Sequence, residues 1–292
     1  MELVTYTDSH AFYQRAEPFL LAHEAEHNLQ LGICSIILAE ASKPVEERQY
    51  PYPFMGVIEE QDEVVAVALC TPPYHLILSL IPRHELADGA LSLLLDHLSV
   101  AQPDLTGVVG TTALSKAFAD HWQQRTGHTY HLRDHERIYR LETVQSVSGV
   151  AGAMRKANRN DRDLLASWYA AFMAEALPTE TSAETAEEWV DRLFETNHRE
   201  AYLWVDQGQA VSWVGTSGNT PSGTRIGPVY TPPSLRGRGY ASACTAAVSQ
   251  LVLDRGKRFC FLFTDLANPT SNDIYQQIGY QSVTDVDNYS FE

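Results

Sequence analysis

Six residues in the C-terminal half of the sequence, Arg236 to Ala241, have the composition of an anion-binding loop. They read Arg-Gly-Arg-Gly-Tyr-Ala, between an apolar strand-like stretch, Arg225–Tyr230, and an alanine-rich stretch of helical composition, Tyr240–Leu253. Glycines let the backbone approach a ligand closely, and the first N–H groups of a helix have no partner within the helix. With the helix dipole and two arginines, this order of strand, loop and helix favours binding of a phosphate group.

Two common phosphate-binding motifs do not fit this loop. A nucleotide P-loop requires a lysine directly after its last glycine, and Gly239 is followed by tyrosine. The dinucleotide fingerprint GxGxxG lacks its third glycine, because Ser242 stands there, and the turn Thr231–Leu235 is too long for a tight strand-to-helix junction. The pattern Gln/Arg-x-x-Gly-x-Gly/Ala does fit, with Arg236, Gly239 and Ala241 at its three specified positions.

A second motif follows the loop. Asn268, Asn272 and Tyr275 precede an Ile-Gly-Tyr sequence that ends at Tyr280, and an apolar strand-like stretch, Phe259–Thr264, stands before them. Together, the loop and this tail resemble the acetyl-CoA-dependent N-acetyltransferases of the GNAT superfamily. The resemblance covers the chain from residue 150 to its end.

This resemblance implies acetyl-CoA or coenzyme A as the cofactor. The strands Arg225–Tyr230 and Phe259–Thr264 would be parallel and splayed apart to admit the pantetheine arm. Tyr275 would protonate the thiolate that leaves when a bound amine attacks the thioester. The residues that the resemblance places at the cofactor are Val229, Tyr230, Thr231, Arg236, Gly237, Arg238, Gly239, Tyr240, Ala241, Asn268, Asn272 and Tyr275.

The residue that takes the proton from the amine is not identified by the sequence. An amine like that of lysine, with a pKa of about 10.4, is almost fully protonated at pH 7. The strand Arg225–Tyr230 contains no acid, so Glu175, Asp265 or a chain of waters is left for this role. A group of aromatic residues predicts either a core or an acceptor pocket; it comprises Trp168, Tyr169, Phe172, Trp189 and Trp213.

Local similarities between the halves indicate an internal duplication. IYRLE at 138–142 resembles NYSFE at 288–292, and the strand and helix patterns of the halves follow a similar order. We expect an α/β (α+β) fold of two GNAT-like modules, residues 1–145 and 150–292, each with a mixed, mostly antiparallel sheet flanked by helices. The first module has Ile81–Glu85, without a glycine, in place of the loop. It is therefore predicted to be a degenerate copy that does not bind the cofactor.

The sequence HEAEH at residues 23–27 matches the HExxH pattern of zinc proteases, in which both histidines share a helix face. Glu26 between the ligands argues against zinc, although Glu40 or Glu46 stays open as an acidic third ligand. A looser histidine set, in a predicted loop and edge strand, comprises His128, His131 and His135. We predict a half-exposed amphipathic helix around residues 23–27, and no metal site in the chain.

Composition narrows the functional class further. A net charge of −16 and a pI of about 5.0 exclude a general binder of nucleic acid or anionic membranes. No apolar run of membrane-spanning length or signal peptide is visible, and four scattered cysteines are typical of a cytoplasmic protein. We therefore expect a monomeric or homodimeric enzyme that acetylates a primary amine of a small, cationic molecule or a peptide. The alternative is an inactive module that binds coenzyme A as a sensor or binds another protein.

Overall fold

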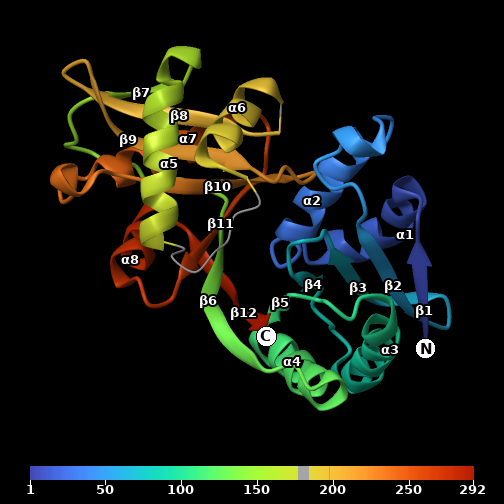
Figure 1. Cartoon of the computed structure of the whole chain (residues 1–292). Helices are drawn as coiled ribbons and strands as arrows, with labels where there is room; N and C mark the ends of the chain where they lie inside the picture. Colours follow the sequence, from blue (N-terminus) through green and yellow to red (C-terminus); the bar gives the residue numbers. More distant parts are fainter. Residues whose placement is uncertain (177–183, 197) are drawn as a thin grey trace. The chain divides into compact units, whose positions relative to one another are not determined.

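The computed structural model describes residues 1–176, 184–196 and 198–292, and contacts divide the chain into two compact units (Figure 1). The first unit contains residues 1–138, 265–267 and 283–292, and the second contains residues 139–264 and 268–282. The predicted module boundaries, residues 1–145 and 150–292, stay a prediction.

The N-terminal half contains a strand, two helices, three strands, a helix, a strand, a helix and a last strand. These elements are β1 (Glu2–Tyr6), α1 (Ser9–Ala22), α2 (Asn28–Ala39), β2 (Phe54–Glu60), β3 (Glu63–Cys70), β4 (Leu76–Leu78), α3 (Ala87–Ala101), β5 (Gly107–Thr111), α4 (Thr112–Thr126) and β6 (Tyr130–Leu141), with 3₁₀ turns at Val45–Glu47 and His84–Leu86.

The C-terminal half repeats this order element by element. Its elements are β7 (Ala153–Lys156), α5 (Arg162–Ala176), α6 (Ala186–Glu195), β8 (Glu200–Asp206), β9 (Gln209–Ser217), β10 (Gly223–Tyr230), α7 (Tyr240–Asp254), β11 (Phe259–Asp265), α8 (Pro269–Ile278) and β12 (Gln281–Phe291), with 3₁₀ turns at Arg159–Asp161 and Pro233–Leu235. The predicted duplication is confirmed by this order.

The sheets of the two units also correspond. In the first unit the strand order is β1-β2-β3-β4-β5-β12, and β4 with β5 is the parallel pair among antiparallel neighbours. In the second unit the order is β7-β8-β9-β10-β11, with β10 parallel to β11 and the other pairs antiparallel. The predicted fold class, two mixed and mostly antiparallel sheets with flanking helices, is confirmed.

The last strand of each half is shared in an unexpected way. β12, at the end of the chain, pairs with β5 of the first unit through Val286–Ser290 (Figure 1). The end of β6 belongs to the second unit, where Tyr139 and Leu141 are buried in the core. Because IYRLE and NYSFE have similar sequences, local pattern does not reveal which sheet each one joins.

Helices cover both faces of each sheet. In the second unit, Leu203 and Trp213 pack with α5 and α6, whereas their neighbours in sequence, Tyr202 and Val214, pack with α7 and α8. This division follows from the alternation of side chains along a strand. The first unit has α1 and α2 on one face and α3 and α4 on the other.

Three local expectations differ from the structure. The helix expected around residues 23–27 is interrupted, because α1 ends at Ala22 and α2 begins at Asn28. The short edge strands β1 and β7 were not predicted, since four or five residues carry too little periodicity to be recognised.

No helix within the described ranges is long and apolar enough to cross a membrane.

Candidate functional site

β10 and β11 are paired only where they begin. Gly223–Arg225 lies opposite Phe259–Phe261 in a parallel ladder, and the ladder does not continue past Arg225 in the described part of these strands. β10 is held on its other side by β9, with a bulge between Ile226 and Val229. The β10 backbone from Ile226 to Tyr230 therefore has one edge open, which is the geometry that an extended ligand requires to add alongside a strand.

The loop after β10 leads into a helix whose N-terminus receives no capping hydrogen bond from a side chain. Gly237 and Gly239 have φ angles of +75° and +79°, a left-handed conformation that favours glycine. Gly239 is the N-cap of α7, and the first turn of this helix contains no acidic residue and receives no side-chain capping bond. Its first N–H groups can therefore bind an anion.

The backbone of this loop faces open space at Gly237. A Cβ added to Gly237 would meet no atom within 4 Å, and residues Arg236–Gly239 are all exposed. A ligand can thus lie against the backbone at Gly237, whereas a Cβ added to Gly239 would come within 2.9 Å of Val150 Cγ2. Together with the open edge of β10, these features suit the phosphate groups and extended arm of coenzyme A.

The side chain of Arg236 is already engaged. Its Nε donates to the carbonyl oxygen of Thr231 at 2.9 Å, and its Nη2 donates to Glu175 Oε2 at 2.5 Å. The guanidinium also lies over the ring of Tyr230, 5.8 Å from the centroid. Burial, and then the charge of Glu175, raise the pKa of Tyr230. The first specified residue of the motif is therefore paired with one of the two acids considered as a base.

Three other predicted cofactor residues have contacts within the protein. The hydroxyls of Thr231 and Ser212 are hydrogen-bonded at 2.9 Å, and Tyr240 OH donates to Asp206 Oδ2 at 2.7 Å. Val229 is half-buried at the bulge of β10. Ala241 is half-buried in the first turn of α7, and Arg238 is exposed in the loop. Their contacts with a cofactor stay a prediction.

The asparagines of the second motif organise the start of α8. Asn268 Oδ1 accepts from the Ser271 N–H at 3.0 Å, which caps the helix. Asn272 Nδ2 donates to the Asn268 carbonyl at 2.8 Å, and Asn272 Oδ1 accepts from Tyr139 OH at 3.0 Å. Both side chains thus position α8, and their role as cofactor ligands stays a prediction.

Tyr275 lies on α8 with only 9% of its surface exposed. Its ring packs edge-on against Tyr280, with the centroids 5.9 Å apart. Burial raises the pKa of Tyr275 to about 12, because a phenolate is poorly solvated there. The phenol therefore stays protonated at neutral pH, as a group must that donates a proton to a leaving thiolate.

The other predicted base, Asp265, and the group of aromatic residues also have contacts within the protein, and the ring of Trp168 packs against Tyr230 with the centroids 6.1 Å apart. Asp265 is exposed at the end of β11, and its Oδ1 accepts from the Ala267 N–H at 2.8 Å. Among the aromatic residues, Tyr169 and Trp189 stack at 4.2 Å. Those that are buried in the core under α5 and α6 are Trp168, Tyr169, Trp189 and Trp213, with Phe172 partly buried beside them. The core interpretation therefore holds for these aromatic residues.

The HExxH sequence has a structural use. His23 follows the end of α1, and His27 precedes α2, so the two do not share a helix face. The ring of His27 is buried between the Leu20 carbonyl, 3.0 Å from Nδ1, and the Leu80 N–H, which donates to Nε2 at 3.0 Å. Burial lowers the pKa of His27 to about 4. Within the described ranges, no group of three His, Cys, Asp or Glu side chains is arranged to hold a metal ion.

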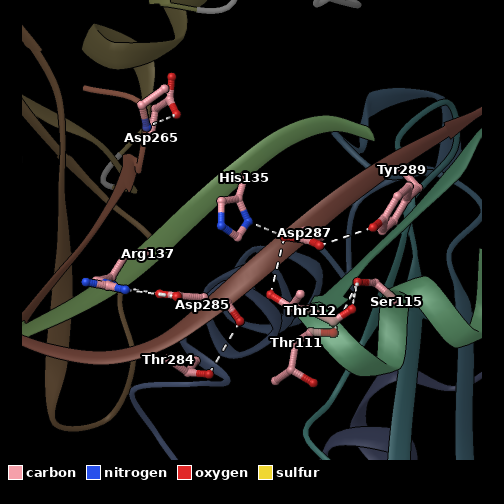
Figure 2. A network of polar contacts seen from close by, with 11 residues as sticks. Thr111, Thr112, Ser115, His135, Arg137, Asp265, Thr284, Asp285, Asp287 and Tyr289 are labelled. Atoms are coloured by element: carbon pink, nitrogen blue, oxygen red, sulfur yellow. Dashed lines mark hydrogen bonds and ion pairs between the residues drawn. The ribbon is translucent and has the colours of Figure 1, made fainter. Parts of the chain in front are cut away.

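A polar network in the first unit was missed by sequence reasoning (Figure 2). The carboxylate of Asp287, on β12, is only 3% exposed; it accepts from Thr112 Oγ1 at 3.3 Å and Tyr289 OH at 3.2 Å. His135 Nδ1 lies 2.5 Å from Asp287 Oδ1. The only signal was His135, in the loose histidine set, because 152 positions separate it from Asp287. Ser115 Oγ donates to the Thr111 carbonyl at 3.1 Å, and the bond from Thr112 to Asp287 links the start of α4 to β12.

Comparison with known proteins agrees with this fold. Residues 204–289 match the model of a family described as FR47-like protein. No curated protein sequence matches the chain.

Three solved structures illustrate the likeness over the whole chain. An acetyltransferase of the GNAT family from Colwellia psychrerythraea is 13% identical, with 100% of both chains covered and a TM-score of 0.56. A Drosophila protein is 13% identical over 99% of this chain and 98% of its own, with a TM-score of 0.72. A tandem GNAT protein from the clavulanic acid biosynthesis pathway is 15% identical over 100% of this chain and 98% of its own, with a TM-score of 0.55.

Proposed function

The chain has the two-module fold of the GNAT superfamily, and we propose that its C-terminal module transfers an acetyl group from acetyl-CoA to a primary amine of a small molecule or peptide. One observation carries the proposal: β10 has an open edge next to a glycine loop and an uncapped helix N-terminus. A strand edge binds an extended arm, and a helix N-terminus binds phosphate. Coenzyme A presents both groups in one ligand.

We propose the following roles for the residues of this module. Acetyl-CoA supplies the acetyl group as a reactive thioester. The N–H groups from Gly237 to Ala241 bind the pyrophosphate, and the β10 backbone near Val229 binds the pantetheine arm. A backbone N–H at Val229 also stabilises the negative charge that develops on the carbonyl oxygen. Tyr275 holds the proton that the departing sulfur receives.

The proposal extends to the acceptor and the setting. We propose a cationic amine, since the chain carries a net charge of −16, and a cytoplasmic protein that acts as a monomer or homodimer. All four cysteines are free and buried, and burial raises the pKa of each to about 12. Thiols of this kind are unreactive, as expected in a reducing compartment.

Thiol release from acetyl-CoA across a panel of amines, amino acids, aminoglycosides and peptides tests the proposal. We expect at least one amine to release thiol at a rate that depends on protein concentration. Acetyl-CoA at 100 times its Kd should also stabilise the fold by about 2.7 kcal/mol. Stabilisation without thiol release from any amine would contradict acetyl transfer. The absence of both effects at millimolar acetyl-CoA would contradict cofactor binding as well.

A further inference from the structure

Glu175 and Arg236 form an ion pair at the edge of the proposed phosphate site. Arg236 Nη2 donates to Glu175 Oε2 at 2.5 Å, and Tyr230 OH lies 3.5 Å from Glu175 Oε1. The side chains of Arg236 and Glu175 are 48% and 44% exposed. A half-exposed pair contributes little to folding, so its partners can be exchanged when a charged ligand arrives.

The position of Glu175 does not favour its own helix. It stands in the last turn of α5, where the helix dipole is negative, and that turn contains no basic residue. A carboxylate is unfavourable there unless a cation lies nearby. The cation that compensates the negative charge of Glu175 is therefore Arg236 of the loop, and no residue in the last turn of α5.

Arg236 directly precedes the glycines that would bind phosphate, and a pyrophosphate offers it a stronger partner than a single carboxylate. We infer that Glu175 holds Arg236 in the cofactor-free protein and, once phosphate has taken Arg236, binds an ammonium group of the cationic acceptor other than the amine that is acetylated. This inference rests on the proposed function and names the residue that positions the acceptor.

The exchange follows from the balance of charge. When Arg236 turns to the phosphate, Glu175 is left without a cation, at the negative end of a helix and beside an anionic ligand. A second amino group of the acceptor, protonated at neutral pH, restores the charge, and the amine that reacts is free to lose its proton. The Tyr230 hydroxyl keeps the carboxylate beside the end of β10, where the proposed reaction takes place. Cofactor and amine then increase each other's affinity by the same factor.

Calorimetric titration of the whole chain with coenzyme A tests the first half of this exchange. Glu175→Gln removes the competing charge, so coenzyme A should bind about fivefold more tightly. Arg236→Gln should weaken binding, and adding Glu175→Gln to it should change nothing further, because Glu175 acts through Arg236. The gain in coenzyme A affinity of Glu175→Gln should vanish in about 1 M salt, where the screening length is about 3 Å. Asp163→Asn removes a 96%-exposed charge from the same helix and should leave the affinity unchanged.

Steady-state kinetics tests the second half, with the diamine or aminoglycoside of the panel that releases thiol fastest. In Glu175→Gln the KM for this acceptor should rise about fivefold while kcat stays within about twofold of wild type, because Glu175 in this role positions the acceptor and is not the base that takes the proton of the amine. The inference predicts that Glu175→Gln binds coenzyme A more tightly and the amine more weakly, whereas a distorted site would bind both more weakly. Unchanged or weaker coenzyme A binding, or an unchanged amine KM, would overturn the inference while wild-type thiol release upholds the proposed function. A wild type that neither binds coenzyme A nor releases thiol would overturn both.

Discussion

The two copies of the fold differ most beside their parallel strands, after β4 in the first copy and β10 in the second. In the first copy, the ring of His27, just before α2, accepts the Leu80 N–H at 3.0 Å shortly after β4. In the second copy the corresponding edge of β10 is open. A strand edge with free N–H and C=O groups can pair with an extended ligand, and this is the role proposed for the edge of β10 in the second copy.

The helices that follow β4 and β10, α3 and α7, also differ at their N-termini. α3 begins after Leu86, has Asp88 in its first turn and is preceded by a connection without glycine. α7 begins after Gly239, in a left-handed conformation, with no acid in its first turn. An acid in the first turn of a helix disfavours phosphate binding there, because the two negative charges repel each other. Element order is therefore shared by the copies, and ligand binding depends on what the side chains leave unoccupied.

The largest expected effect is that of Gly237→Ala. Its Cβ would project into the empty space over the loop, so the stabilisation by acetyl-CoA, about 2.7 kcal/mol at 100 times Kd, should be lost. The free protein should lose only about 1 to 2 kcal/mol, from a non-glycine residue in the left-handed region. Urea unfolding with and without acetyl-CoA measures both quantities.

Gly127→Ala is the matched control. Gly127 caps α4 in the first copy with a φ of +83°, and its added Cβ would also meet no atom within 4 Å. The backbone strain is the same, but the response to acetyl-CoA should be intact. If Gly127→Ala abolished the response too, the phosphate site could not be assigned to the second copy.

Tyr275→Phe should lower kcat by about 100-fold, because general acid catalysis contributes about 10²–10⁴. Coenzyme A affinity should not change, since the ring is retained. With a pKa of about 12 for Tyr275, deprotonation of this group should not reduce kcat between pH 8 and 10. Tyr289→Phe is the control in the first unit, where burial also raises the pKa of Tyr289 to about 12. A similar loss of kcat in both variants would speak against proton donation by Tyr275.

His27 should make the fold sensitive to acid. Its pKa is about 4 in the folded chain and about 6.5 when unfolded, so the unfolded chain takes up the proton first as the pH falls. Stability from this residue is present above pH 6.5 and is lost between pH 6.5 and 4. From pH 7 to 5 the loss is on the order of 2 kcal/mol.

In His27→Gln this part of the acid sensitivity should disappear. Urea unfolding at pH 7 and pH 5 measures it, and His84→Gln, which changes an exposed histidine of the same unit, should keep the wild-type difference. An equal pH dependence of the unfolding free energy in wild type and His27→Gln would show that the His27 ring is not buried between Leu20 and Leu80 as described.

The smallest effect is expected from Arg83→Ala, in the first copy's counterpart of the loop. Arg83 pairs with Glu60 at 2.9 Å and Glu63 at 3.2 Å, and its side chain is 44% exposed. Unfolding free energy should change by less than about 1 kcal/mol, and binding of acetyl-CoA should not change. A clear loss of acetyl-CoA binding would place part of the cofactor site on Arg83.

Sequence pattern predicted the parts of the fold that have a strong period. The hairpin of β2 and β3, the helix α7 and its preceding loop are found where they were expected, because each has an apolar period and glycine or proline at its ends. The break between α1 and α2 was not predicted, since HEAEH contains no residue that stops a helix. The tertiary bonds of His27 to Leu20 and Leu80 hold the break.

The places of the motif residues in the fold were predictable as far as the motifs reach, and their chemistry stays a prediction. Arg236, Gly239 and Tyr275 were selected by motif positions, and the structure places them on the loop and on α8. The contact of Glu175 with Arg236 was not predicted, because 61 positions separate the two residues and no local pattern joins them. The pairing of β12 with β5 is likewise set by tertiary structure.

Amide hydrogen exchange with and without acetyl-CoA tests the difference between the copies most directly, since it reads both regions in one unmodified protein. We predict slower exchange with acetyl-CoA in residues 226–241, at the open edge of β10 and the start of α7, and no change in residues 77–88. Protection of residues 77–88, or no protection of residues 226–241 at millimolar acetyl-CoA, would contradict the assignment of cofactor binding to the second copy alone.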